Sequence, residues 1–175
     1  MTKKRLSLIE CNPNILKTAI KGDKELEKEL NIVVCEDWTE FGIEALQYAL
    51  NKLSESQDEK GWWTYFPIHK KDKKLIGSGG YKGKPNVFGE VEIGYEIAKS
   101  YRNQGLGTEM AKELVERAFK QKLVKSVIAH TLGEENSSTK ILIKCGFDKI
   151  EEIEHPEEGK IWKWRIEKNT YLKTL

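Results

Sequence analysis

Residues 90–98 alternate between apolar and polar side chains, which is the period of a strand with one buried face. The apolar face carries Val91, Ile93, Tyr95 and Ile97, and the opposite face carries Glu90, Glu92, Gly94 and Glu96. After a short turn, residues 106–121 place apolar side chains four positions apart. That spacing predicts an amphipathic helix, so the segment reads as a strand followed by a helix.

The rest of the chain shows the same two hydrophobic periods, one typical of helices and one typical of strands. Helices are predicted over 13–21, from residue 23, over 39–55 and after residue 136, capped by Asn12, Asp23, Thr39 and either Asn136 or Ser137. Strands are predicted over 5–11, 62–68, 74–81 and 126–131, then as a short strand from Phe147 and a last strand around 162–166. This order predicts an α+β (mixed α/β) fold, with helices on the faces of one sheet.

Length and charge narrow the protein class. A chain of 175 residues suits one domain spanning 1–175. The net charge is +2, which gives no overall reason to expect a nucleic-acid partner. No apolar stretch approaches the length that crosses a membrane, and the start of the chain lacks an apolar secretion core. Three cysteines far apart fit a cytoplasmic protein better than a disulfide or metal scaffold.

The turn before the helix at 106–121 carries the chemistry. It contains Arg102, Gly105 and Gly107 in the spacing R-x-x-G-x-G. Glycines at a helix start let backbone N–H groups approach an anion such as pyrophosphate, although they also suit a tight turn without any ligand. Two other phosphate motifs are excluded: residues 78–85 lack the Walker pattern, and Met110 stands where a dinucleotide fingerprint needs its third glycine.

The run VEIGYEIAKSYRNQGLGTEMAKELVERAF, the later run VIAHTLGEENSSTKILIKCGF and the upstream LIGSGGYKG resemble the GCN5-related N-acetyltransferase (GNAT) superfamily. Within it they are most similar to the ribosomal-protein-alanine acetyltransferase-like branch. The resemblance implies a single, mostly antiparallel, splayed sheet of six to seven strands flanked by helices. It also implies a coenzyme-binding core at about 74–150 and acceptor-side helices at about 12–56.

The resemblance implies acetyl-CoA as co-substrate, no metal, and coenzyme contacts along two segments. The pantetheine arm would pair with backbone between residues 90–98 and 126–131, which makes Tyr95, Ile97 and Ala98 candidates. The pyrophosphate would sit on Arg102, Asn103, Gln104, Gly105, Leu106, Gly107 and Thr108. Further on, Asn136 matches a coenzyme-facing position, and Ser137 and Ser138 are the alternatives. Helix capping would also explain an asparagine or serine at each of these positions. Lys144 is a candidate for the 3′-phosphate or a partner of the helix dipole.

Acetyl transfer to an amine needs a base, because an alkylamine with a pKa of about 10.4 arrives mostly as ammonium. By resemblance the first candidate is Glu92 and the second is Glu90, and the alternative is that both belong to a solvated strand face. An amide N–H near Tyr95 could stabilise the oxyanion. Many relatives place a tyrosine acid where this chain has Leu142, so we expect Ser138 to hydrogen-bond the leaving thiol.

Two functions follow from these residues. The first is an N-acetyltransferase that moves the acetyl group of acetyl-CoA to a primary amine, either a protein N-terminus or a small molecule, by direct attack in a ternary complex. The alternative is a non-catalytic acyl-CoA-binding or interaction domain of the same fold. We expect no nucleic-acid or membrane partner and leave a homodimer open. Cys145 lies on the apolar side of its helix, so we expect it to pack rather than react.

Overall fold

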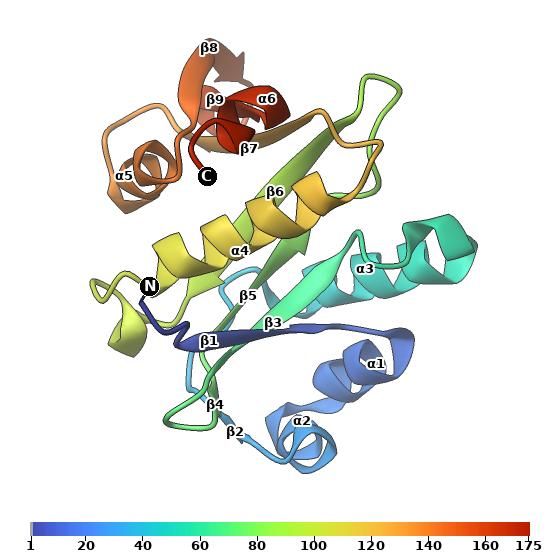
Figure 1. Ribbon diagram of the computed structural model, residues 1–175. Coiled ribbons are helices and arrows are strands. Elements are labelled where there is room, and N and C mark those ends of the chain that lie inside the picture. Colours follow the sequence, from blue (N-terminus) through green and yellow to red (C-terminus); the bar gives the residue numbers. More distant parts are fainter. Residues whose placement is uncertain (1) are drawn as a thin grey trace. The chain divides into compact units, whose positions relative to one another are not determined.

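The computed structural model describes residues 2–175 and divides the chain into two compact units (Figure 1). The first holds the chain up to Lys84 together with Tyr95–Met110, and the second holds Pro85–Gly94 and Ala111–Leu175. Strand β6 (Glu90–Ile97) and helix α4 (Leu106–Lys120) contribute residues to both units. Among the described residues, no helix has the length and apolar character needed to cross a bilayer.

The first unit contains the following elements: β1 (Leu6–Glu10), α1 (Pro13–Lys21), α2 (Asp23–Leu30), β2 (Val33–Val34), α3 (Gly42–Glu55), the 3-10 turn η1 (Gln57–Glu59), β3 (Thr64–His69), β4 (Lys74–Leu75), β5 (Gly77–Tyr81) and the 3-10 turn η2 (Lys99–Tyr101). Its strands β1, β4 and β5 all pair with β3 in antiparallel fashion, and the short β2 lies parallel to β4. Apolar side chains of α1, α2, α3 and these strands form one core around Leu16, Leu26 and Phe66.

The local signals for the first helices are physical and visible in the sequence. The Asn12 side chain accepts a hydrogen bond from the backbone N–H of Ile15 at 2.9 Å, which caps α1 as predicted. Gly22 ends α1 in a conformation with φ of 150°. Asp23 was predicted as the cap of α2, but Gly22 takes that position, because the Asp23 carboxylate instead accepts from the indole N–H of Trp38 at 3.0 Å.

Two predicted boundaries shift. Helix α3 begins at Gly42 rather than beside Thr39, and the Thr39 hydroxyl accepts the N–H of Gly42 at 3.1 Å. The predicted strand 74–81 is split into β4 and β5 at Ile76, whose N–H donates to Pro67 O and whose carbonyl accepts from Ala98 N. Ile76 therefore bridges two neighbouring strands at the break.

The second unit contains the first residues of β6, most of α4, β7 (Ser126–Leu132), α5 (Ser137–Lys144), β8 (Asp148–His155), β9 (Gly159–Glu167) and α6 (Lys168–Leu172). Strands β6 and β7 are parallel, with a register that runs from Glu90 opposite Ser126 to Glu92 opposite Ile128. Strands β7 and β9 pair antiparallel over seven residues, and β8 with β9 forms a hairpin. The short helix α6 was not predicted; its Tyr171 ring packs on Phe119.

The strands follow the order β2-β4-β3-β5-β6-β7-β9-β8, with β1 on β3. This confirms the predicted α+β class with a largely antiparallel sheet flanked by helices. Residues 2–175 form nine strands rather than six or seven, because the two-residue strand β2 was not predicted and the predicted strand 74–81 is divided into β4 and β5.

Candidate active site

The turn between β6 and α4 is built around two left-handed residues. Asn103 and Gly105 have φ of 59° and 77°, a conformation that glycine adopts without steric cost. A Cβ added to Gly105 would lie 3.4 Å from the guanidinium of Arg5, whose Nη1 donates to Gln104 O at 2.7 Å. The turn is therefore held from outside by Arg5, and helix α4 starts directly after it at Leu106.

Glu109, in the first turn of α4, fixes the start of β1 against this helix. Its Oε1 accepts the backbone N–H groups of Arg5 at 2.6 Å and Leu6 at 2.8 Å, and its Oε2 accepts from Arg5 Nε at 3.1 Å. An acidic side chain at a helix start also interacts favourably with the helix dipole. The result is a firmly positioned helix N-terminus whose backbone amides follow Gly105.

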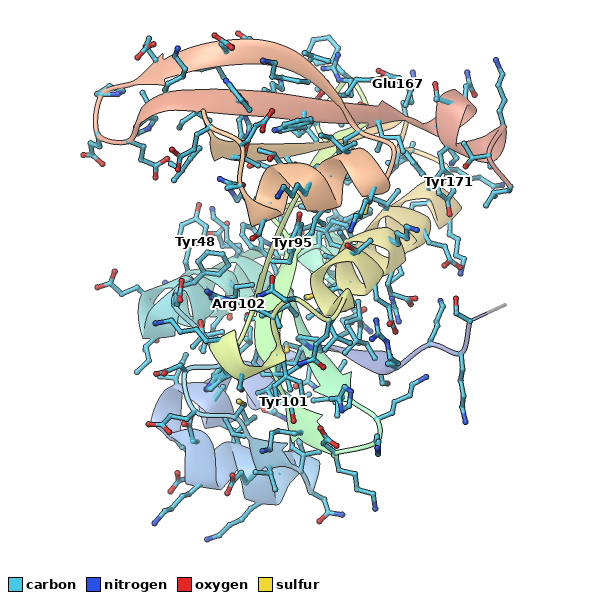
Figure 2. The ribbon with its side chains drawn as sticks, turned by 90° about the vertical axis from the view of Figure 1, so that its left-hand side faces the viewer. Tyr48, Tyr95, Tyr101, Arg102, Glu167 and Tyr171 are labelled. Atoms are coloured by element: carbon cyan, nitrogen blue, oxygen red, sulfur yellow. The ribbon has the colours of Figure 1, made fainter. Side chains whose placement is uncertain are left out.

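Arg102 is engaged within the first unit rather than extended (Figure 2). Its Nε donates to Ile97 O at 2.8 Å, and its Nη2 lies 3.0 Å from Glu40 Oε1. The backbone N–H of Glu40 donates in turn to Glu96 Oε2 at 2.8 Å. Arg102 and Glu96 thus tie the segment before α3 to the end of β6.

The predicted coenzyme contacts at the end of β6 differ in their availability. The N–H of Ala98 donates to Ile76 O at 2.7 Å, and its carbonyl accepts from Tyr101 N at 2.9 Å. The carbonyl of Ile97 accepts from Arg102. The N–H of Ala98 is therefore already used within the protein, whereas the carbonyls of Ile97 and Ala98, with two lone pairs each, can accept a second hydrogen bond, so both residues stay candidates. Tyr95 is half-buried and stays a candidate.

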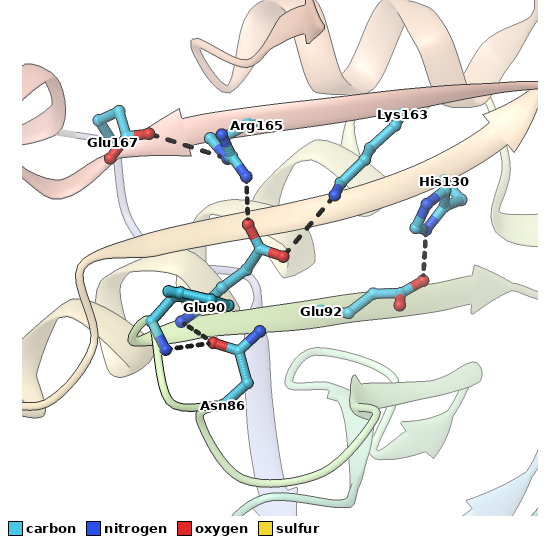
Figure 3. A network of polar contacts seen from close by, with 8 residues as sticks. Asn86, Glu90, Glu92, His130, Lys163, Arg165 and Glu167 are labelled. Atoms are coloured by element: carbon cyan, nitrogen blue, oxygen red, sulfur yellow. Dashed lines mark hydrogen bonds and ion pairs between the residues drawn. The ribbon is translucent and has the colours of Figure 1, made fainter. Parts of the chain in front are cut away.

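Glu90 and Glu92 lie in the second unit and have different partners (Figure 3). Glu90 Oε2 accepts from Arg165 Nη2, and its Oε1 lies 3.7 Å from Lys163 Nζ, both on β9. The Glu90 backbone N–H is bound by Asn86 Oδ1 at 3.0 Å. Both carboxylate oxygens of Glu90 therefore face permanent cations, which is the arrangement of a structural ion-pair network.

Glu92 faces a histidine instead. His130 Nδ1 lies 2.8 Å from Glu92 Oε1, and their side chains are 29% and 21% exposed. At this distance the imidazole nitrogen and the carboxylate oxygen share a hydrogen bond. The sequence analysis does not single out His130 as a partner of Glu92. The parallel register brings the two together, since Glu92 lies opposite Ile128 and residue 130 follows two positions later on the same face.

Helix α5 carries the remaining predicted residues. Asn136 Oδ1 accepts the N–H of Thr139 at 3.0 Å, and Thr139 Oγ1 accepts the N–H of Asn136 at 2.9 Å, which makes a reciprocal capping box. This places Asn136 as the cap. Ser138 is exposed in the first turn, and Lys144 is exposed in the last. Leu142 is 1% exposed, so this position serves packing.

A family model described as the acetyltransferase (GNAT) domain matches residues 19–148, which is most of the chain. The protein belongs to the GNAT acetyltransferase family. This confirms the resemblance seen in the sequence, and the match extends it to the helices before residue 74.

A curated relative agrees with this assignment. The uncharacterized N-acetyltransferase YjdG of Bacillus subtilis is 29% identical over 144 residues, covering 82% of this chain and 86% of that protein. The chain is thus an N-acetyltransferase of a family that uses acetyl-CoA as donor.

Two solved structures share the fold of this acetyltransferase. The ribosomal-protein-S5-alanine acetyltransferase from Vibrio fischeri has a TM-score of 0.70 at 14% identity, with 98% and 97% of the chains covered. The spermidine N-acetyltransferase from Vibrio cholerae, solved with CoA and spermine, has a TM-score of 0.69 at 15% identity, with 97% and 99% covered. The name of the first neighbour gives a ribosomal-protein alanine as its substrate, and that of the second gives spermidine.

Two of the cysteines, Cys11 and Cys145, have thiol pKa values raised by burial. Burial raises the pKa of the Cys145 thiol to about 11, although Lys112 acts in the opposite direction. Cys11 is buried too, and its pKa is raised well above the usual range. A thiol is a weak nucleophile until it is deprotonated. Among residues 2–175, no group of three or more histidine, cysteine or acidic residues is arranged to hold a metal ion.

Proposed function

We propose that this acetyltransferase moves the acetyl group of acetyl-CoA to a primary amine by direct attack, with Glu92 and His130 taking the proton. The observation that carries this is the 2.8 Å contact between His130 Nδ1 and Glu92 Oε1. A carboxylate beside an imidazole is a combination that accepts and passes on a proton. Glu90, with Arg165 and Lys163 on its two oxygens, supports the strand instead.

The reaction balances without a covalent enzyme intermediate. The ammonium form of the acceptor gives a proton to the Glu92–His130 pair, directly or through water. The amine nitrogen then bonds to the thioester carbonyl carbon, and the C–S bond breaks. The attacking nitrogen loses one N–H proton and the leaving thiolate takes one up, so the products are an N-substituted acetamide and the free thiol of the coenzyme. Ser138, in the first turn of α5, is the side chain that we propose hydrogen-bonds the sulfur.

The coenzyme pyrophosphate would be bound by the backbone amides of residues 102–108. Gly105 supports this, because its left-handed backbone with φ of 77° suits a residue without a Cβ, whose main chain a phosphate can approach closely. The dipole of α4 adds favourable potential for a phosphate at this end. Arg102 is already bonded to Ile97 and Glu40, so we propose that it shapes this turn and that the main chain provides most donors.

The acceptor that we propose is a primary amine on a small molecule or at a protein N-terminus. The two structural neighbours, whose names give spermidine and a ribosomal-protein alanine, support this range. A panel of polyamines, aminoglycosides and N-terminal peptides would separate the two classes. The panel is incubated with acetyl-CoA, and thiol release is measured for each amine.

The decisive comparison uses three proteins and the best amine of the panel. Glu92→Gln keeps the shape of the side chain but cannot take a proton, so kcat/KM should fall by at least about 100-fold. Glu90→Gln is the matched control on the same strand face and should stay within about tenfold of wild type. Equal thiol release from wild type and Glu92→Gln would remove Glu92 from the mechanism. Binding of acetyl-CoA without turnover of any amine would favour a non-catalytic domain.

A further inference from the structure

Basic residues gather at one end of the first unit. The sequence places Lys3, Lys4 and Arg5 before β1, and Lys70, Lys71, Lys73 and Lys74 in and after the turn that joins β3 to β4. We call this set the basic face. The chain as a whole carries only +2, so this concentration leaves the remaining surface with an excess of acidic groups. The net charge of the whole chain therefore does not reveal this local concentration of basic residues.

The pairing of β1 with β3 brings these two segments together. Leu6 lies opposite His69, and the N–H of Lys70 donates to Arg5 O at 2.9 Å. The start of β1 and the turn after β3 consequently lie at the same end of the unit (Figure 1). Two runs separated by more than sixty residues in the chain thus form one surface.

The turn that displays the lysines is held in place. Asp72 Oδ2 accepts the phenol O–H of Tyr101 at 2.7 Å and lies 3.0 Å from His69 Nδ1. Lys73 adopts a left-handed backbone with φ of 50°. The acidic side chain inside the basic run is therefore bound to its own neighbours. Lys70, Lys71 and Lys73 remain exposed, and none of them forms a salt bridge with another residue in the described part of the chain.

The chemistry of the face selects among anionic partners. Lysines are flexible point charges that suit phosphates without imposing a fixed geometry. The large apolar side chains that are exposed, such as Phe41, Val87 and Phe88, lie outside the face; within residues 2–5 and 69–74 the structure exposes none. A membrane-inserting surface would need such groups, and a single-strand binder would need rings for base stacking. Val33, opposite Lys74, is the half-exposed apolar side chain that borders the face, which is too little to insert into a bilayer. The rings of His69 and Tyr101 at the turn pack on each other, with centroids 5.3 Å apart, so they are not presented for base stacking. This favours backbone phosphates that point outward from a duplex.

We propose that the basic face binds the phosphate backbone of a double-stranded nucleic acid, RNA or DNA, without reading its sequence. This function is separate from acetyl transfer and does not rest on the proposed base. Binding would release counterions, so affinity should fall steeply with salt, by a slope of about 0.9 for each phosphate neutralised. The face would place the acetyltransferase near substrates that are themselves bound to nucleic acid.

The test measures fluorescence anisotropy of labelled duplexes of about 20 base pairs at about 50 mM salt, in separate RNA and DNA arms. The test variant is Lys70→Glu/Lys71→Glu/Lys73→Glu. The matched control is Lys17→Glu/Lys24→Glu/Lys60→Glu, which reverses three exposed lysines of the same unit elsewhere. Thermal unfolding confirms that both variants are folded.

We expect wild type to bind at least one duplex, with the test variant losing about tenfold or more in affinity and the control staying within about twofold. The salt slope of the test variant should be shallower by about 2–3. Four results would overturn the proposal: no duplex binding by wild type, equal losses in both variants, tighter binding to a single strand or to anionic vesicles than to duplex, or full displacement of the duplex by CoA.

Discussion

His130 Nδ1 lies 2.8 Å from Glu92 Oε1, although the two residues are 38 positions apart in the chain. The contact depends on the parallel register of β6 and β7, which sets Glu92 beside Ile128 and places residue 130 on the same face. Each strand therefore contributes one residue to the pair that we propose takes the proton from the acceptor amine.

The first prediction concerns this pair. His130→Gln keeps a hydrogen-bonding side chain but removes the titrating ring, so kcat should fall by about tenfold or more with little change in the KM for acetyl-CoA. The shape of the pH–rate profile should change as well, because one of the two proton-handling groups is lost. Steady-state kinetics between about pH 6 and pH 9 would check it. A parallel drop at every pH, with an unchanged profile, would show that His130 only supports the strand.

The second prediction concerns Gly105. Replacement by alanine places a Cβ on a left-handed backbone at φ of 77° and 3.4 Å from Arg5, which should cost about 1–2 kcal/mol in unfolding free energy. It should also raise the KM for acetyl-CoA, because the turn carries the proposed phosphate amides. Gly159→Ala is the matched control: its φ is 75°, but nothing lies within 4 Å of the added Cβ. A KM change of equal size in both variants would contradict a coenzyme role for the turn.

The third prediction concerns Arg102 and Glu40. Since Arg102 bonds both Glu40 and Ile97 O, Arg102→Ala should loosen the turn and raise the KM for acetyl-CoA more than it lowers kcat. Glu40→Gln should raise that KM less, and the double variant should show less than the sum of the two effects. Lys52→Ala, which breaks the exposed pair with Glu55, is the control and should leave KM unchanged. Additive effects would mean that the two side chains act independently.

Features that depend on residues close together in the chain could be predicted from the sequence. Contacts between side chains on neighbouring strands could not. The Asn12 cap and the turn from Arg102 into α4 depend on neighbours within a few residues, so residue type and period reveal them. The His130 partner of Glu92 and the β9 cations on Glu90 depend on strand register. Register is set by the packing of whole strands, which no short window of sequence contains.

The basic face and Arg102 show the same contrast between features visible in the sequence and contacts set by the tertiary structure. The lysine runs at 3–5 and 70–74 are plain in the sequence, but only the pairing of β1 with β3 makes them one surface. Arg102 was predicted as a phosphate donor from its motif. Its hydrogen bond to Ile97 O and its ion pair with Glu40 come from the way η2 folds back on β6, a tertiary contact that the motif does not encode.

The fourth prediction uses Glu96. Burial raises the pKa of this carboxyl, while hydrogen bonds from Thr39, Glu40 and Phe41 act in the opposite direction. A carboxyl with a raised folded-state pKa holds its proton more tightly when folded. Stability contributed by Glu96 is therefore present at low pH and falls as pH rises from about 4.3 through the folded value.

Glu96→Gln cannot ionise, so it should be more stable relative to wild type at about pH 7 than at about pH 4, which means a larger unfolding free energy relative to wild type at the higher pH. Urea unfolding at the two pH values measures the difference. A difference that does not change between the two pH values would show that the hydrogen bonds from Thr39, Glu40 and Phe41 offset the effect of burial at this site.

The last prediction separates Cys145 from the chemistry. With its pKa raised to about 11, the thiol is almost fully protonated at neutral pH and should react slowly with a thiol reagent such as iodoacetamide. Cys145→Ala should keep thiol release from acetyl-CoA within about twofold of wild type, since no acetyl-cysteine forms in direct attack by the amine. Mass spectrometry of the labelled protein, compared with the protein unfolded in urea, measures the protection. Rapid labelling of Cys145 in the folded protein, together with loss of turnover in Cys145→Ala, would point to a covalent route and would displace Glu92 and His130 from the central role.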